Sequence, residues 1–97
     1  MVHIREIQHG HEVLLAACDH GLLGQVYREG EIVLDIKESF YGGETGDVEA
    51  LTELFHQATI INLVGENCVA AAIDSGLACE EEVLVIDGVP HLQIVRM

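Results

Sequence analysis

One dipeptide near the end of the chain constrains the fold more than any other feature. Asp87-Gly88 separates two apolar stretches, residues 83–86 and residues 91–95. An Asp-Gly pair favours the type I′ turn that joins two antiparallel strands. Pro90 lacks an amide hydrogen, so its strand is expected to lie at a sheet edge or to begin there. The sequence therefore predicts a β-hairpin over residues 83–95.

Two more hairpins are expected in the first part of the chain. Residues 2–5 alternate in polarity, and a turn at His9-Gly10 leads into residues 12–18, which are apolar on both faces. Such a two-sided run is typical of a central strand. Residues 25–28 and 31–37 flank a turn at Glu29-Gly30. Because each tight connection joins neighbouring strands, we expect a mostly antiparallel sheet.

Helical spacing follows in the middle of the chain. Asp47 is a good N-cap, and the helix after it is expected to run to about Ala58 with its apolar residues on one face. A second helix is expected over residues 62–75, ended by Gly76 in a left-handed conformation. Residues 59–61 are either a helix end or a short strand. The prediction is a single α+β domain, residues 1–97, with a mostly antiparallel sheet of about six strands and two helices packed on one face.

The composition predicts an aliphatic core. Hydrophobic residues make up 49% of the chain and aromatic residues only 4%. The mean hydropathy of +0.32 is high for a chain with this many charges. A surplus of apolar side chains suits burial between subunits as well as within one. We therefore keep a homo-oligomer as a hypothesis.

The charge is strongly one-sided. Seventeen acidic residues stand against four basic ones, and the formal net charge is −13. The bases are Arg5, Arg28, Lys37 and Arg96. A surface of this kind repels phosphate backbones, so direct nucleic-acid binding is not expected. The acidity fits either a salt-rich cytoplasm or a binding surface for a basic partner.

Nothing in the sequence points to export or to a membrane. The first six residues show no basic segment followed by an apolar one. An apolar run as short as residues 13–18, which no other run exceeds, cannot span a bilayer. The three cysteines, Cys18, Cys68 and Cys79, are odd in number and widely spaced, so no disulfide framework is implied. We expect a cytoplasmic protein.

A glycine-rich stretch, residues 40–47, precedes the first expected helix. It matches no phosphate-binding or dinucleotide-binding pattern, and acidic residues within it would compete with an anion. We therefore expect a tight turn with positive φ at Gly42, Gly43 or both. Phe40 and Tyr41 are half of the aromatic residues in the chain. They are either a contact patch for a partner or a plug in the core.

The adjacent Cys18, Asp19 and His20 do not suit a catalytic set. Successive strand residues point to opposite faces, and a neighbouring carboxylate raises the pKa of a thiol. Asp19 is instead expected to accept amide hydrogens in the turn that follows it. His9 and His11 together with Cys18 and His20 offer four nitrogen and sulfur ligands, but their spacing matches no standard zinc module. No metal ligand, cofactor or catalytic residue is assigned.

Arg28 and Lys37 lie on the second expected hairpin, near Phe40 and Tyr41. They form either a small positive spot or pairs with neighbouring carboxylates, and exposed pairs of this kind contribute little. The residues that we single out as a candidate binding site are Asp19, Arg28, Lys37, Phe40, Tyr41, Gly42 and Gly43.

Several short motifs resemble a known family. They are Ala17-Cys18-Asp19, Leu22-Leu23-Gly24, Phe40-Tyr41-Gly42-Gly43, Asn62-Leu63-Val64-Gly65-Glu66 and Gly88-Val89-Pro90-His91. In this order they resemble an archaeal family of uncharacterised conserved proteins, domain of unknown function 424. The resemblance implies an archaeal cytoplasmic protein and brings no established activity. It adds Gly24 and Gly65 to the candidate positions.

Two functions from different classes remain open. The first is a non-catalytic interaction module, an accessory of translation or other information-processing machinery that acts through a protein partner. The alternative is a small-molecule-binding protein or enzyme that uses Asp19 and Tyr41 near residues 40–46, with Asp19 as a base or acceptor and Tyr41 as a donor. The lack of a recognisable catalytic set favours the interaction module.

Overall fold

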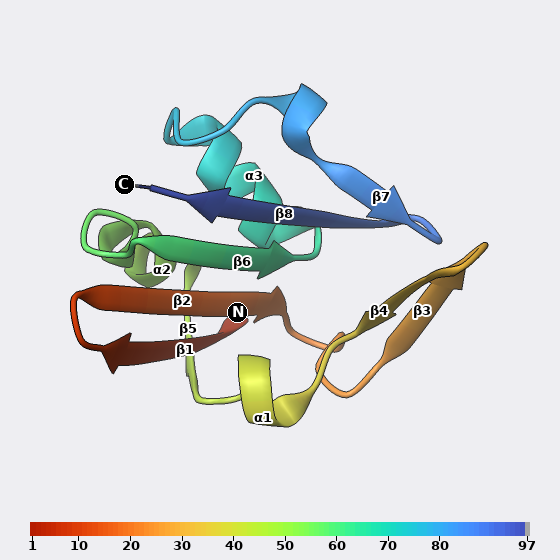
Figure 1. Cartoon of the computed structure of the whole chain (residues 1–97), viewed down its shortest axis with the longest axis horizontal. Helices are drawn as coiled ribbons and strands as arrows, with labels where there is room; N and C mark the ends of the chain where they lie inside the picture. The colour runs from red at the N-terminus through yellow and green to blue at the C-terminus, as the bar shows by residue number, and fades with distance from the viewer. Residues whose placement is uncertain (97) are drawn as a thin grey trace.

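The computed structural model describes residues 1–96, in which a six-stranded mixed sheet is the central element (Figure 1). Its strand order is β5-β1-β2-β6-β8-β7. All neighbouring strands are antiparallel except β2 and β6, which are parallel. The strands are β1 (Val2–His9), β2 (Glu12–Asp19), β5 (Glu44–Gly46), β6 (Ile60–Val64), β7 (Leu84–Ile86) and β8 (Val89–Val95).

The second expected hairpin exists but does not join this sheet. β3 (Val26–Glu29) and β4 (Ile32–Asp35) form a separate two-stranded sheet. The α+β class is confirmed, whereas the expected composition of the sheet was wrong in two places. Two further strands complete the six: β5 was not expected, and β6 begins at Ile60, so residues 60 and 61 form the short strand that was one of their two interpretations.

The hairpin around Asp87-Gly88 forms as expected. Asp87 has φ 49° and Gly88 has φ 80°, which suits a type I′ turn, and Ile86 pairs with Val89. Its second strand, β8, is an inner strand of the sheet. Pro90 fits in this inner strand because the pairing of β8 with β6 ends at His91, opposite Val64. Pro90 lies just outside that paired stretch.

The first long helix, α2 (Val48–Leu54), begins where the sequence predicts. Asp47 Oδ1 accepts a hydrogen bond of 2.8 Å from the amide of Ala50. The second, α3 (Glu66–Asp74), begins later than expected. The expected helix start at Asn62 was wrong because residues 60–64 extend as β6 beside β2, and Gly65, with φ 106°, separates strand from helix. Gly76 follows α3 with the expected positive φ of 80°.

Two cores lie on opposite faces of the six-stranded sheet. On the face that we call the back face, α2 and α3 pack against the sheet, with Leu51 and Cys68 beside Leu15 and Leu63. On the front face, the hairpin β3–β4 and the short helix α1 (Glu38–Tyr41) cover Ala16, Cys18 and Val64. The two long helices therefore share one core, while α1 belongs to the other (Figure 1). No helix within residues 1–96 is long and apolar enough to cross a membrane.

Candidate functional site

Asp19, the first of the expected site residues, is engaged by the fold itself. Its Oδ2 accepts a hydrogen bond of 2.9 Å from the amide of Asn67, and its Oδ1 accepts one of 3.0 Å from the amide of Cys68. The carboxylate thus caps the N-terminus of α3, where a negative charge is favoured. The expected partners in the following turn were wrong, because α3 presents its free amides directly to the end of β2.

Gly65 is the residue that permits this cap. A Cβ atom at Gly65 would lie 2.4 Å from Cγ of Asp19, and the φ of 106° disfavours any other residue. Glycine is needed at position 65 because the carboxylate of Asp19 occupies the place where a side chain would begin. A shallow hollow of about 250 Å³ lies beside this cap, between the ends of β2 and β6 and the β7–β8 turn. Both carboxylate oxygens of Asp19 already accept amide hydrogens of α3.

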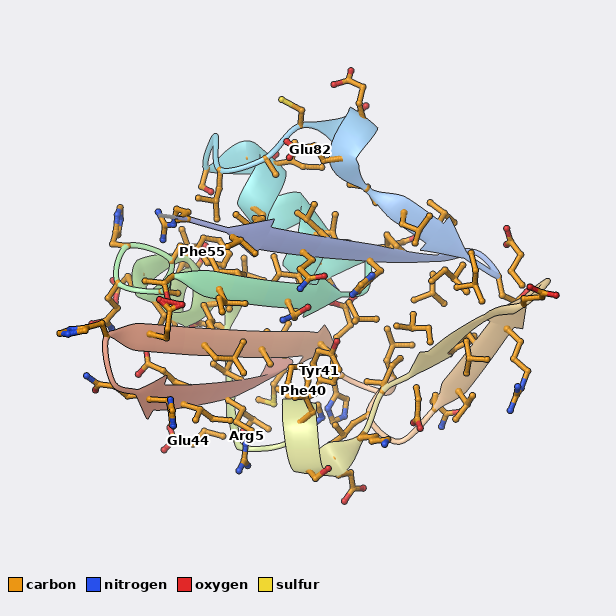
Figure 2. The ribbon with its side chains drawn as sticks, in the orientation of Figure 1. Arg5, Phe40, Tyr41, Glu44, Phe55 and Glu82 are labelled. Atoms are coloured by element: carbon orange, nitrogen blue, oxygen red, sulfur yellow. The ribbon has the colours of Figure 1, made fainter. Side chains whose placement is uncertain are left out.

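Phe40 and Tyr41 form part of the front core. Tyr41 is buried, Phe40 is half-buried, and their rings meet edge to face with centroids 4.9 Å apart (Figure 2). Burial raises the pKa of Tyr41 to about 12. Of the two interpretations of this pair, the structure supports the core plug. Tyr41 and Asp19 therefore offer no basis for the small-molecule or enzymatic alternative.

Gly42 and Gly43 serve close packing and not a left-handed turn. Gly42 has φ −77°, and neither residue is among those with positive φ, so the expected positive φ was wrong. A Cβ atom on Gly42 would lie 2.5 Å from the carbonyl oxygen of Glu38. One on Gly43 would lie 2.5 Å from the carbonyl oxygen of Ile4. Both glycines thus allow the chain to pass from α1 onto the edge of β1.

Arg28 and Lys37 are exposed, on β3 and just before α1. Glu29, one of the carboxylates expected near them, instead accepts a 2.8 Å hydrogen bond from the amide of Asp87. This bond ties the β3–β4 hairpin to the β7–β8 turn. Asp19 caps α3, Phe40 and Tyr41 pack in the front core, and the two basic side chains are exposed. The seven candidate residues therefore do not converge on one site.

The histidine and cysteine set is spread along the first hairpin. His9 pairs with Glu12 at one end of β2, whereas Cys18 pairs with His3 at the other end. Within residues 1–96 no group of three potential ligands lies close enough to hold a metal ion. Burial, together with the Asp19 carboxylate, raises the pKa of Cys18 to about 11, and burial likewise raises that of Cys68. These thiols are poor nucleophiles at neutral pH.

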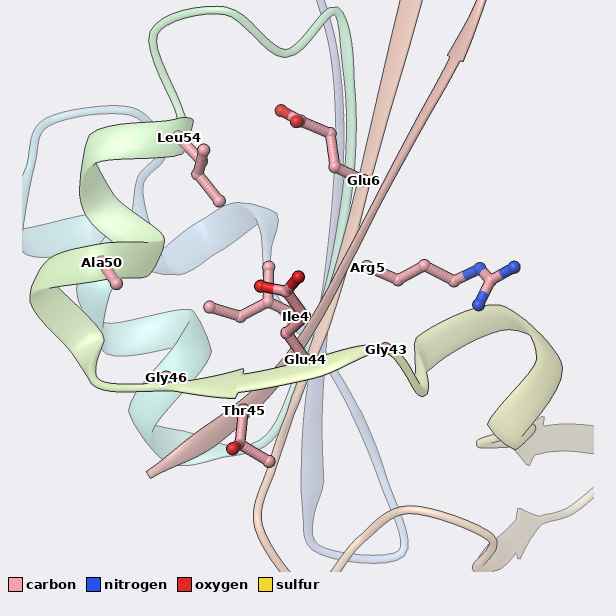
Figure 3. A pocket seen from close by; sticks show the side chains of 9 residues that line it. All are labelled: Ile4, Arg5, Glu6, Gly43, Glu44, Thr45, Gly46, Ala50 and Leu54. Carbon is pink, nitrogen blue, oxygen red and sulfur yellow. The ribbon is translucent and has the colours of Figure 1, made fainter.

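An open site lies instead at the outer edge of β1. There the structure has a hollow of about 560 Å³ between β1, β5 and α2 (Figure 3). Ala50 and Leu54 of α2 form one wall, and Ile4 and Glu6 of β1 form the opposite wall. Glu44 of β5 closes one end. The hollow combines an aliphatic lining with two carboxylates.

The backbone of β1 is unpaired along this hollow. β5 pairs only with Val2, His3 and Ile4, so within the described chain residues 5–9 have no partner strand on the side away from β2. The carbonyl of Ile4 points toward Gly43. Because backbone groups alternate in direction along a strand, those of Glu6 and Gln8 point to the same open side. Each offers one N–H and one C=O to a further strand.

The charges around the hollow are divided between the two faces of the sheet. Ile4 pairs with Glu44, and Glu6 is two residues further along β1, so both carboxylates lie on the side of α2. Arg5 points to the other face, where its Nη1 donates a 2.9 Å hydrogen bond to the carbonyl of Gly42. Arg5 thus lines the hollow from the opposite side of β1, and the side that faces α2 carries the two carboxylates.

Sequence reasoning missed the residues of this site, Glu6, Glu44 and Leu54 among them. A strand of three residues such as β5 leaves no periodicity, and Glu-Thr-Gly resembles a loop. Gln8 and Glu6 look like ordinary exposed strand residues until the short length of β5 is known. The alternation of residues 2–5 predicted a strand here, but no sequence signal predicted that its outer side is open.

Comparisons with known proteins agree with this structure. A family model described as "Protein of unknown function (DUF424)" matches residues 7–97. A similar solved structure is the "Crystal structure of an uncharacterized conserved protein from Methanopyrus kandleri", an archaeal protein with 30% sequence identity. The match has a TM-score of 0.81 and covers 99% of this chain and 93% of that one. A search of curated proteins finds no match.

Proposed function

The chain belongs to the family "Protein of unknown function (DUF424)", as its motifs indicated, and we propose that it is a non-catalytic interaction module for a protein partner. The partner contributes an extended, basic segment that adds as a strand to the open edge of β1. The observation that carries the proposal is this edge, unpaired over residues 5–9, beside a hollow with two carboxylates.

Strand addition uses the backbone of β1. Residues 5–9 extend for about 17 Å, which is enough for a segment of about five residues. The N–H and C=O groups of Glu6 and Gln8 would bond to the added strand, as in other complexes in which a peptide extends a sheet. Main-chain bonds of this kind supply affinity and do not depend on the sequence of the segment.

Side chains of the added strand supply the specificity. Alternate residues would point toward α2, between Leu54 and Ala50 on one side and Glu6 on the other. Lysine and arginine fit this place, because their stems can cover the aliphatic lining while their charged ends reach Glu6 and Glu44. The sequence left two explanations for the acidity. For these two carboxylates, we favour a binding surface for a basic partner over adaptation to a salt-rich cytoplasm.

The cellular setting that we propose is an accessory role in cytoplasmic translation or other information-processing machinery. Contact with RNA would pass through the protein partner, because two of the four basic residues are engaged within the chain. Arg5 donates to the carbonyl of Gly42, and Nη2 of Arg96 donates to the carbonyls of Phe55 and Ala58. Only Arg28 and Lys37 remain for phosphate contacts, too few for a nucleic-acid footprint.

Fluorescence anisotropy with labelled peptides tests the proposal. The probe is a peptide of alternating lysine and valine, about seven residues long, and the matched control alternates glutamate and valine. We expect the basic peptide to bind and the acidic one not to bind. Binding should weaken as salt is raised, because both carboxylates are exposed to screening.

A substitution at Gln8 separates strand addition from simple charge attraction. Gln8→Pro removes an amide hydrogen that points to the open side and spares the β1–β2 ladder. We expect Gln8→Pro to lower the affinity for the basic peptide by about tenfold, the value of one lost hydrogen bond. We expect Gln8→Ala to leave that affinity within about twofold of the unmodified chain. Equal affinity for both variants, or for both peptides, would overturn the proposal.

A further inference from the structure

A second surface lies on the front face, away from the open edge. Ile7, Leu14, Ile60 and Val95 are direct neighbours across four strands, β1, β2, β6 and β8. Ile7 is 36% exposed and Val95 is 62% exposed, while Leu14 and Ile60 are half-buried. We call these four side chains the aliphatic row.

The aliphatic row is on the front face because Leu14 is in phase with Ala16 and Cys18, which belong to the front core. The cover of that core, α1 and the β3–β4 hairpin, lies over the other half of the sheet. In Figure 1 no element of residues 1–96 lies in front of the half that ends at the β1–β2 turn. The row is therefore an uncovered apolar stripe on an inner part of the sheet.

The surroundings of the row are poor in negative charge. The four strands that carry it contain three acidic residues, Glu6, Glu12 and Asp19. Strand alternation and the α3 cap place Glu6 and Asp19 on the back face, so Glu12 alone shares the front face with the row. Arg5 and His9 of β1 lie on that same face, on either side of Ile7. The chain as a whole carries seventeen acidic residues.

We propose that a second copy of this chain docks on the aliphatic row, front face to front face. Two chains of charge −13 repel each other, so they can meet only where carboxylates are scarce, and this face is such a place. A two-fold arrangement packs row against row and lets Glu12 of one copy approach His9 of the other. A basic protein partner would gain little electrostatic attraction here, because Glu12 is the one carboxylate of these four strands on the front face.

The size of the patch sets the expected affinity. Four strands spaced about 4.8 Å apart, over about six residues of strand length, give roughly 400 Å² per copy. This is about half of what a standard stable interface buries on each partner, so the dimer is weak and reversible. We expect a dissociation constant in the range of tens to hundreds of micromolar, roughly. The dimer leaves the outer edge of β1 free, and it does not depend on peptide binding.

Sedimentation equilibrium tests the dimer on the full chain, from about 10 μM to about 1 mM. The mass should rise from 10.6 kDa toward twice that value. Added salt should strengthen association, because it screens the repulsion between the copies and leaves the apolar contact intact. The same salt should weaken binding of the basic peptide to the β1 edge. The dimer and the peptide site can therefore be refuted independently of each other.

Two matched variants locate the interface. Val95→Asp places a charge in the aliphatic row, whereas Val85→Asp places the same charge on β7, at a valine that is 52% exposed. We expect Val95→Asp to weaken the dimer at least about tenfold and Val85→Asp to leave it within about twofold of the unmodified chain. Circular dichroism should show both variants folded, since both valines are exposed.

Three outcomes would overturn the proposal. They are a monomer at every concentration and salt, a dimer that salt dissociates, and a dimer that Val95→Asp leaves intact.

Discussion

The two edges of the six-stranded sheet end in different ways. At the other edge lies β7, a strand of three residues, where the β3–β4 hairpin packs against Ile86 on the front face and Glu29 accepts the amide of Asp87. At the β1 edge the cover is the three-residue strand β5, and residues 5–9 remain open beside the hollow. Exposed edges tend to pair with other chains, and natural proteins usually protect them. The longer unpaired stretch, residues 5–9, thus lies at the β1 edge beside the hollow, and this is the edge that the proposed strand addition uses.

The largest expected difference between the edges is in the stability that their aliphatic residues provide. Ile86 of β7 is 3% exposed within the front core, whereas Ile7 of β1 is 36% exposed. We expect Ile86→Ala to lower the free energy of unfolding by about 3 kcal/mol and Ile7→Ala by less than about 1 kcal/mol. Urea denaturation measures both. Equal losses would mean that Ile7 is packed as tightly as Ile86.

A substitution at Gly43 should extend the open edge. The added Cβ of Gly43→Ala would lie 2.5 Å from the carbonyl oxygen of Ile4, so β5 must move away from β1. We expect a loss of about 2 kcal/mol, the usual cost of forcing an extra group into a packed place. Hydrogen exchange should then show less protection at Ile4. The control Glu44→Ala, one residue further along β5, should cost less than about 0.5 kcal/mol.

High pH should weaken the covered half of the front face. Burial raises the pKa of Tyr41 to about 12 from its ordinary value of 10.0. The folded state therefore keeps the neutral phenol while the unfolded chain ionises, so this stability is complete below about pH 10 and falls as the pH rises toward 12. Between pH 8 and pH 10.5 we expect the unmodified chain to lose about 1 kcal/mol more than Tyr41→Phe. The same loss in both chains would contradict the assignment.

The smallest expected effect is at the two carboxylates of the open edge. Glu6→Gln combined with Glu44→Gln should change the free energy of unfolding by less than about 0.5 kcal/mol, because neither side chain supports the core. The same double variant should weaken the basic peptide by about fivefold or more. Glu49→Gln with Glu53→Gln on α2 is the matched control in charge. A double variant that loses stability but not binding would make this edge structural.

The sequence predicted elements whose signal is local. Asp87-Gly88 specifies its turn by two backbone conformations, and Asp47 specifies a helix start by one side-chain bond. The buried face of the first helix followed from spacing, and Leu51 and Phe55 are indeed buried. Features of this kind need no knowledge of distant parts of the chain.

The remaining features depend on distant contacts. Residues 62–64 were expected to begin a helix because Val64 and Cys68 also fit helical spacing, and residues 59–61 fitted either a helix end or a short strand. Only pairing with β2 makes residues 60–64 a strand. Asp19 was expected to serve its own turn because the amides of Asn67 and Cys68 are far away in sequence. The open edge of β1 is harder still to predict from the sequence, because it depends on where β5 ends and not on any residue type.

The parallel pair of β2 and β6 has a consequence for the order in which the chain can acquire structure during synthesis. The β1–β2 hairpin can form early from neighbouring residues, but β2 stays half-covered until residues 60–64 leave the ribosome. The β3–β4 hairpin waits longer, because its neighbour β7 lies at Leu84–Ile86. Nearly the whole chain must therefore be made before the front core closes, and until then Ala16 and Cys18 face the solvent. Until then these apolar strands can associate with other apolar surfaces.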